Sequence, residues 1–265
     1  MREIAMDQYH TVLPLLDSIQ NKAVYALSVI QHIQQGSVFV NEGKSINSVF
    51  ITSSGGFYCL AGDEEDDLFI ADVVGFMNNE SNHHNFFALG VFTADWEKKI
   101  DAYLIKHSRK ISRTYYSFHQ ERFVESYVMS DSMVQKPFKY YPLEVDIATT
   151  YREKFYPYYQ LVWPSAERFC TSGIGHFIMM EDELISVCTS PYVGGGYAEI
   201  VIITIDEFRR QGLACALGVL FINDCLAQNL IPNWSCHTDN VACNELAHKF
   251  GFEKIGEHPM YWYTT

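Results

Sequence analysis

Residues 198–214 read Ala-Glu-Ile-Val-Ile-Ile-Thr-Ile-Asp-Glu-Phe-Arg-Arg-Gln-Gly-Leu-Ala, a β-branched run that ends in a charged turn and opens into a helical pattern. A strand that empties into a helix start presents free backbone N–H groups, and the helix dipole adds roughly half a positive charge there. Gly212 lets an anion come close to the backbone because it has no side chain. The stretch therefore predicts a phosphate site where the helix begins.

The flanking segments extend this pattern into an α/β layout. Apolar runs at 173–180 and 184–189 are joined by a tight turn, so 197–205 is expected to be the third strand of an antiparallel meander. The elements expected after it are a helix from Gly212 to near Asn229, a strand at 233–237 parallel to the third strand, a helix at 240–250 and two paired strands at 253–255 and 260–263. Short side chains are expected to cap the two helices: Asp206 and Glu207 the first, Thr238 or Asp239 the second.

The earlier part of the chain alternates helical and extended patterns of its own. The patterns are helical spacing over 7–34, strand–turn–strand over 48–61, a segment at 68–76 that fits helix or strand, a strand at 86–92, a helix capped by Thr93 that ends near His107, and a strand at 113–118. Regular patterning thins near Pro137 and Pro142. We therefore expect an N-terminal α/β domain, 1–135, and a second domain, 136–265.

Composition limits the function. The net charge of −13 argues against a nucleic-acid partner and is compatible with a small cationic substrate in an acidic cleft, although solubility explains most of it. Asp63–Asp67 reads as a solvated acidic turn. No apolar run approaches the roughly 18 residues of a membrane helix, and the N-terminus is too polar for a signal peptide. Seven scattered cysteines predict free thiols and a cytoplasmic protein. The pair His83-His84 lacks a third ligand at usable spacing, so no metal is expected.

Two motifs resemble the GNAT acetyltransferase superfamily. One is the R-x-x-G-x-A spacing of Arg209, Gly212 and Ala214, and the other is the block 240–252, which opens on Asn240 and closes on Gly-Phe. The resemblance covers about 140–265 and implies the acyl-CoA N-acyltransferase fold, an α/β (α+β) fold with a mixed central sheet. With Trp234-Ser-Cys-His237, the block is most similar to the branch that includes zwittermicin A resistance acetyltransferases.

A weaker likeness reaches into the N-terminal half through Ser54-Gly-Gly-Phe-Tyr58 and Gly62-Asp63. It implies that the N-terminal domain is a degenerate copy of the same fold, packed on the second domain.

The resemblance implies an N-acetyltransferase that moves acetyl from acetyl-CoA to a primary amine of a small molecule by direct attack in a ternary complex. The cofactor would be held by the backbones of Ile203 and Ile205, by the loop Arg209, Arg210, Gln211, Gly212, Leu213 and Ala214, and by Asn240.

Other side chains are candidates for chemistry. Glu199 is the expected base, since a partly buried carboxylate has a raised pKa; the alternative is a solvent-facing or salt-bridged side chain. Trp234 and His237 are expected near the acceptor, the alternative being plain core aromatics. No metal, nucleic acid or membrane is implied.

One departure concerns the leaving group. Many members carry a tyrosine where this chain has Ala247, and that tyrosine protonates the CoA thiolate. Tyr261 and Tyr263 are the substitutes that the sequence offers, and solvent is the other source of a proton. Two other functions stay open: a non-catalytic acyl-CoA sensor, favoured by Ala247, and an aminoacyl-transferase of the tandem GNAT type, which the acidic charge disfavours.

Overall fold

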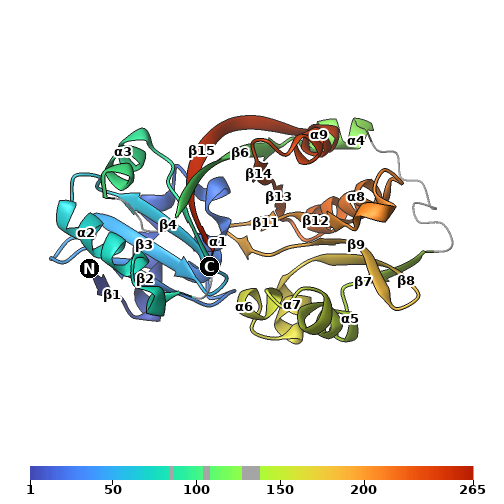
Figure 1. Cartoon of the computed structure of the whole chain (residues 1–265), viewed down its shortest axis with the longest axis horizontal. Helices are drawn as coiled ribbons and strands as arrows, with labels where there is room; N and C mark the ends of the chain where they lie inside the picture. The colour runs from blue at the N-terminus through green and yellow to red at the C-terminus, as the bar shows by residue number, and fades with distance from the viewer. Residues whose placement is uncertain (84–85, 104–107, 127–137, 265) are drawn as a thin grey trace.

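The computed structural model describes residues 1–83, 86–103, 108–126 and 138–264 (Figure 1). The helices and strands of the N-terminal half are β1 (Arg2–Glu3), η1 (Met6–Leu16), η2 (Gln20–Lys22), α1 (Val24–Ile30), β2 (Gly36–Val40), β3 (Ser48–Ser53), β4 (Phe57–Gly62), α2 (Asp67–Met77), η3 (Glu80–Asn82), β5 (Phe86–Gly90), α3 (Ala94–Tyr103), β6 (Arg109–Phe118) and α4 (Gln120–Ser126). The C-terminal half continues with β7 (Lys139–Pro142), α5 (Val145–Thr150), the π-helical turn η4 (Tyr151–Phe155), α6 (Tyr159–Val162), α7 (Ala166–Ser172), β8 (Gly175–Met180), β9 (Glu183–Thr189), β10 (Val193–Gly194), β11 (Tyr197–Glu199), β12 (Val201–Thr204), η5 (Asp206–Phe208), α8 (Leu213–Ala227), β13 (Ile231–Asn233), β14 (Ser235–His237), α9 (Val241–Lys249) and β15 (Phe252–Thr264).

The two halves repeat one order of elements. In the first half the antiparallel strands β2, β3 and β4 are followed by α2, by β5 parallel to β4, and then by α3 and β6. In the second half the antiparallel strands β8, β9 and β12 are followed by α8, by β13 parallel to β11, and then by α9 and β15. The mixed α/β architecture expected from the sequence is confirmed.

The halves exchange their last strands. β15 lies between β5 and β6, and β6 lies between β15 and β14, so the sheet order runs β1-β2-β3-β4-β5-β15-β6-β14. The last strand of the first half, β6, thus pairs with β14 of the second half, and the last strand of the second half, β15, pairs with β5 of the first. The two exchanged strands also pair with each other, from Phe252–Phe118 to Trp262–Arg109. Figure 1 shows β6 and β15 arching across both halves.

This exchange corrects the prediction for the C-terminal segment. The stretches 253–255 and 260–263 do not pair with each other, because both belong to the continuous strand β15. The register shifts by one residue between Lys254 and Gly256, where Ile255 has no partner on β6, as in a β-bulge.

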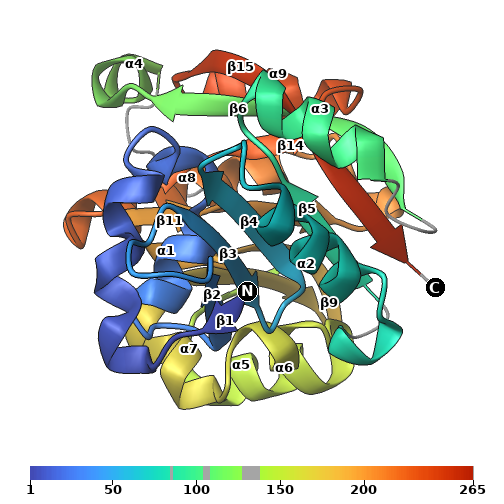
Figure 2. The same cartoon turned by 90° about the vertical axis from the view of Figure 1, so that its left-hand side faces the viewer.

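Two apolar clusters stabilise the fold on opposite sides of the N-terminal sheet. One packs α2 and α3 against β3, β4, β5 and the Tyr261 and Tyr263 side chains of β15. Figure 2 views the molecule from this side, with both helices in front of the sheet. The other cluster is continuous from η1 and α1 into the core of the C-terminal half. The halves therefore share a core as well as a sheet.

Local predictions have mixed outcomes. The segment 68–76 is helical within α2, and 7–34 forms the 3-10 helix η1, the short η2 and one α-helix. Thr93 caps α3 through its Oγ1, which accepts from the Trp96 N–H at 3.2 Å. The boundary between 135 and 136 and the predicted helix end near His107 fall outside the described residues.

We expect residues 1–126 expressed alone not to form a stable monomer, because β5 and β6 lose β15 between them and leave strand edges unpaired. Co-expression with 138–265 as a second chain should yield a complex that copurifies. Circular dichroism, size-exclusion chromatography and thermal melts check both outcomes. A monomeric 1–126 that unfolds cooperatively would contradict the exchange.

Candidate functional site

The site lies where paired strands separate. β11 and β13 run parallel, with Tyr197 opposite Ile231 and Glu199 opposite Asn233. The Ile200 N–H still donates to the Asn233 carbonyl at 3.0 Å, and beyond that point β12 pairs with β9 while β14 pairs with β6. Among the described strands, β12 and β14 are each at the edge of a sheet. Their unpaired sides leave backbone groups that an extended ligand can bind.

The backbone direction of β12 corrects one prediction. The Ile205 N–H donates to the Ile185 carbonyl at 3.0 Å, and the Ile203 carbonyl accepts from Ser186 Oγ at 3.2 Å, so both residues turn their backbone toward β9. Because backbone direction alternates along a strand, Ile202 and Thr204 face the unpaired side instead. Ile203 and Ile205 are therefore one residue out of register for backbone contact with a ligand there.

The start of α8 has the geometry of an anion site. Gly212 is the N-cap residue in the left-handed region, at φ +81°, with no capping side chain. The helix begins with the Ala216 N–H bonded to the Gly212 carbonyl, and the amides of Gln211 to Ala214 make no hydrogen bond within the described chain. These N–H groups are free for a phosphate.

The charged turn before α8 is organised by Arg209. Its guanidinium pairs with Asp206 at 2.7 Å and donates from Nε to the Thr204 carbonyl at 3.2 Å. Asp206 and Glu207 lie in η5, five or more residues before the N-cap Gly212, so the prediction that they cap α8 is wrong. Arg210 adopts φ +62°, which places two left-handed residues in this turn.

The corresponding helix start in the first half has opposite character. Gly62 and the acidic run Asp63–Asp67 lead into α2, and the carboxylate of the N-cap residue Asp66 already accepts the Phe69 N–H at 3.0 Å. Negative side chains at this position repel phosphate groups. Of these two related helix starts, that of α8 is suited to phosphates.

A cavity of about 320 Å³ opens beside Glu199, between the two halves. Its wall is mostly aromatic and comes from both halves. The lining residues are Lys22, Tyr25, Phe57, Phe86, Arg113, Tyr115, Tyr156, Tyr158, Tyr159, Pro191, Tyr192, Glu199, Ile200, Val201, Asn233, Ser235, Met260 and Trp262. The volume suits a small molecule.

Glu199 is the carboxylate of this cavity. Burial raises its pKa to about 7, and the Arg113 guanidinium moderates the rise. A carboxylate that titrates near neutral pH can accept a proton in the physiological range. The cavity also contains the cations Arg113 and Lys22, so its charge does not match the acidic cleft that the net charge of the chain suggested.

The sequence motif Ser54-Gly-Gly-Phe-Tyr58 positions part of the aromatic wall. The Tyr158 hydroxyl donates to the Gly55 carbonyl at 2.7 Å and lies 3.3 Å from the Tyr192 hydroxyl. A Cβ on Gly55 would lie 2.1 Å from the Tyr192 hydroxyl, so glycine is needed for this close approach. The motif therefore brings the two halves into contact at the cavity, which the sequence alone did not predict.

Strand alternation keeps three of the predicted site residues, Tyr261, Tyr263 and Trp234, out of the cavity. On β15 it is Met260 and Trp262 that line the wall, while Tyr261 points to the opposite face, where its hydroxyl donates to Asp101 at 2.5 Å. Burial and that bond raise the pKa of Tyr261. Tyr263 stacks on Phe87 on the same far face.

Trp234 is likewise turned away, between the cavity residues Asn233 and Ser235. Its ring packs against Phe250 and Phe252 in the core. Its position fits the plain core reading.

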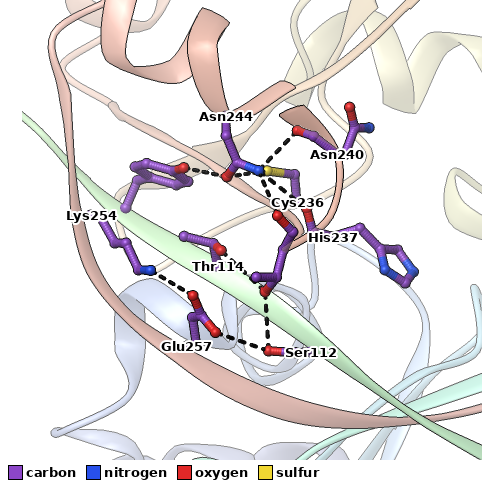
Figure 3. Close-up of polar contacts among 10 residues, drawn as sticks. Ser112, Thr114, Cys236, His237, Asn240, Asn244, Lys254 and Glu257 are labelled. Carbon is purple, nitrogen blue, oxygen red and sulfur yellow. Dashed lines mark hydrogen bonds and ion pairs between the residues drawn. The ribbon is translucent and has the colours of Figure 1, made fainter. Parts of the chain in front are cut away.

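Asn244 of α9 is a polar centre that the sequence reading missed (Figure 3). Its amide nitrogen donates to the carbonyls of Thr238 at 3.0 Å and Asn240 at 2.8 Å, and its oxygen accepts from Cys236 Sγ at 3.2 Å and from the Tyr116 hydroxyl. The adjoining Thr238, Thr114 and Ser112 hydroxyls form a chain that fastens α9 to β6. Glu257, paired with Lys254, accepts from Ser112.

Asn240 and His237 border this network. The Asn240 side chain caps α9 by accepting the Cys243 N–H at 3.1 Å, so neither Thr238 nor Asp239 is the cap. The His237 imidazole points away from Asn244 in Figure 3 and does not line the cavity. Burial and the nearby Arg113 lower the pKa of His237. Ala247, one turn after Asn244, is fully buried.

Three further properties concern the described residues. They contain no group of three or more histidine, cysteine or acidic side chains placed to hold a metal. None of the helices in these ranges is both long and apolar enough to cross a membrane. All seven cysteines are free thiols.

Known proteins resemble this chain along its whole length. A family model described as GNAT acetyltransferase matches residues 14–261. An uncharacterized N-acetyltransferase of Bacillus subtilis (strain 168), YdfB, is 24% identical over 262 residues, which cover 99% of this chain and 98% of that protein.

Solved structures share the fold. A GCN5-related N-acetyltransferase-like protein from Streptococcus suis 89/1591 has a TM-score of 0.74 at 20% identity, over 97% of this chain and 98% of its own. A tandem GNAT protein from the clavulanic acid biosynthesis pathway has a TM-score of 0.63 at 11% identity, over 99% and 97%. The second likeness supports the reading of two fused copies.

We expect Glu199→Gln to stabilise the protein at pH 8 and to have little effect at pH 5. The folded protein keeps the Glu199 proton up to about pH 7, whereas the unfolded chain releases it near pH 4.5, so wild-type stability falls as pH rises between these values. The difference at pH 8 should be about 3 kcal/mol. Urea unfolding at the two pH values measures it, and equal stabilities at pH 8 would show that Glu199 is not desolvated.

Proposed function

This chain belongs to the GNAT acetyltransferase family, and we propose that it moves an acetyl group from acetyl-CoA to a primary amine of a small molecule. One observation carries the proposal. Glu199 stands where β11 and β13 stop pairing, with the aromatic cavity beside it and the unpaired edges of β12 and β14 beyond it. This arrangement gives an amine and a thioester a common meeting point.

The residues present fit an acyl-CoA cosubstrate, which the fold implies. The amides of Gln211, Gly212, Leu213 and Ala214 would hold the pyrophosphate at the start of α8, with Arg210 adding charge. Arg209 is engaged with Asp206 and would orient the turn.

The pantetheine arm would lie along the unpaired edge of β12. There the backbones of Ile202 and Thr204 point outward and can hydrogen-bond an extended chain as a strand would. Asn240, at the start of α9, retains its amide nitrogen for the same arm.

In the transfer itself, Glu199 would take a proton from the ammonium group of the acceptor. The neutral amine attacks the thioester carbonyl, a C–N bond forms, the C–S bond breaks, and the excess proton on nitrogen passes to water. An alkylammonium of pKa about 10.4 is almost wholly protonated at pH 7, so a base with a pKa of about 7 aids the reaction. Positioning of the two reactants supplies much of the remaining rate.

The CoA thiolate would take its proton from solvent. Ala247 offers no acid, and the hydroxyls of Tyr261 and Tyr263 face away from the cavity. A thiol of pKa about 8.5 is readily reprotonated near neutral pH. Because Ala247 replaces the tyrosine acid of many family members, the alternative function is that of a sensor that binds acyl-CoA without turnover.

The class of amine that accepts the acetyl group is supported by the family resemblance and by the pKa of Glu199. The likeness to zwittermicin A resistance acetyltransferases makes antibiotic-like aminopolyols one acceptor class to test, and the raised pKa of Glu199 fits any primary amine. Release of free CoA thiol in the presence of a panel of amines tests the activity. Acetyl-CoA binding without turnover on any amine would favour the sensor.

We expect Gly212→Leu to weaken acetyl-CoA binding at least about a hundredfold, because the side chain would occupy the space in front of the free amides. Gly196→Leu is a matched control: Gly196 has φ +82°, equally open surroundings, and lies in the turn before β11. Both variants carry similar backbone strain, so isothermal titration calorimetry isolates the phosphate site. Equal affinities in the two variants would place the phosphates elsewhere.

We expect Glu199→Gln to lower kcat/KM by about 10² to 10⁴, the usual size of a general-base contribution. In the wild type, kcat/KM should rise with pH through about 7, because the deprotonated carboxylate is the active form. The variant should lose that limb. A variant profile that keeps the inflection near 7 would assign the base role to another group.

A further inference from the structure

We propose that the acceptor is an aromatic amino-acid-like zwitterion: a primary amine that also carries a carboxylate and a large apolar body. The inference rests on the proposed function, in which the amine is delivered to Glu199. It follows from the charges, the unpartnered donor and the aromatic wall of the cavity beside that residue.

Arg113 is the group that would bind the carboxylate. Its Nη2 donates to the Ser235 carbonyl at 3.0 Å and to Ser235 Oγ at 2.9 Å, which fixes the guanidinium in the cavity wall. Within the described chain, the arginine ion pairs are those of Arg122 with Glu253 and Arg209 with Asp206. Arg113 interacts with Glu199 through space but forms no direct ion pair with it, so the guanidinium can still bind a ligand carboxylate. A held guanidinium with free donors matches a carboxylate, whose two oxygens it can bind in parallel.

Asn233 adds a second donor. Its side chain is 2% exposed, it lines the cavity, and its amide nitrogen has no hydrogen-bond partner among the described residues. A buried donor without a partner costs free energy that a bound oxygen would recover. Asn233 lies opposite Glu199 in the β11–β13 register, close to where the amine must react.

The charge balance excludes polycations as preferred acceptors. Glu199 is the carboxylate among the lining residues, and it faces two cations, Arg113 and Lys22. Burial lowers the pKa of Lys22, and no ion pair with an acidic side chain is formed by it in the described structure. A polyamine would bring further positive charge into this wall, whereas a zwitterion places its ammonium at Glu199 and its carboxylate at Arg113.

The rest of the cavity wall is mostly aromatic and fits an apolar group of the acceptor. Phe86 packs on Trp262 with ring centroids 4.8 Å apart, and Phe57 packs on Tyr192 at 5.7 Å. The Tyr192 hydroxyl is occupied by Ser53 at 3.1 Å, so the wall presents mainly ring faces and edges. Such a wall favours an aromatic side chain.

Three acceptors of similar shape test the carboxylate: L-phenylalanine, L-phenylalaninamide and 2-phenylethylamine, each with acetyl-CoA and the full chain. We expect kcat/KM for phenylalanine to exceed that for either analogue at least about tenfold, as a charge-assisted pair implies. The amide has a less basic amine, which works against the expected order. Spermidine and an aminopolyol complete the panel, and a preference for either, or for 2-phenylethylamine, would overturn the proposal.

Arg113→Gln should lower the ratio of kcat/KM for phenylalanine to kcat/KM for 2-phenylethylamine at least about tenfold. Loss of the guanidinium also raises the pKa of Glu199 further, but that effect is common to both amines and cancels in the ratio. Arg122→Gln, the same substitution at an exposed site on α4, should leave this ratio unchanged. If Arg113→Gln fails to fold, the near-isosteric Asn233→Asp should penalise phenylalanine selectively, because it places a second negative charge beside the carboxylate. Equal losses for both amines would assign Arg113 and Asn233 a structural role instead.

Calorimetry separates this inference from the proposed function. N-acetyl-L-phenylalanine should bind at least about tenfold more tightly than N-acetyl-2-phenylethylamine, and Arg113→Gln should remove the difference. If the protein shows this preference for N-acetyl-L-phenylalanine but does not bind acetyl-CoA, the proposed transferase function is wrong and the proposed ligand class stands. If acetyl-CoA is turned over without any preference for acceptors that carry a carboxylate, the transferase function stands and the proposed acceptor class is wrong.

Discussion

The pairing of β6 with β15 is the constraint on which the rest of the structure depends. These strands come from opposite halves of the chain, and their ladder runs from Phe252–Phe118 to Trp262–Arg109. The same ladder builds the site, because Arg113 reaches the cavity from β6 and Trp262 from β15. A site between two fused copies is therefore held by backbone hydrogen bonds and does not rely on side-chain contacts alone.

The two copies have diverged in chemistry while keeping one architecture. The second half retains a helix start with free amides and Gly212, whereas the acidic run Asp63–Asp67 leads into the related helix of the first half. The first half contributes walls, through Tyr25, Phe57 and Phe86. The net charge of −13 belongs to the chain as a whole, and the cavity differs from it, with one carboxylate against two cations.

Local sequence patterns predicted the elements well and the long-range pairing badly. The strand before Gly212 and the meander follow from residue type and spacing, whereas the break at Ile200 divides a segment that was expected to be one strand over 197–205. That 253–263 is one strand shared by both halves follows from partners more than a hundred residues away, which periodicity does not encode. Glu199 was singled out because a lone carboxylate in an apolar strand is conspicuous, and the structure places it in the cavity wall. Arg113 and Asn233 were missed because their meaning comes from strands that meet only in the fold, and Tyr261 was misplaced because a one-residue alternation reverses its face.

The exchanged strand also sets a schedule for synthesis. β5 ends at Gly90, and its partner on one side begins pairing only when residues up to Thr264 have been made. At typical translation rates that interval lasts about 10 to 35 s. For all of it, the side of β5 that later pairs with β15 is an open strand edge, so the sheet can be completed only after the second half has been made.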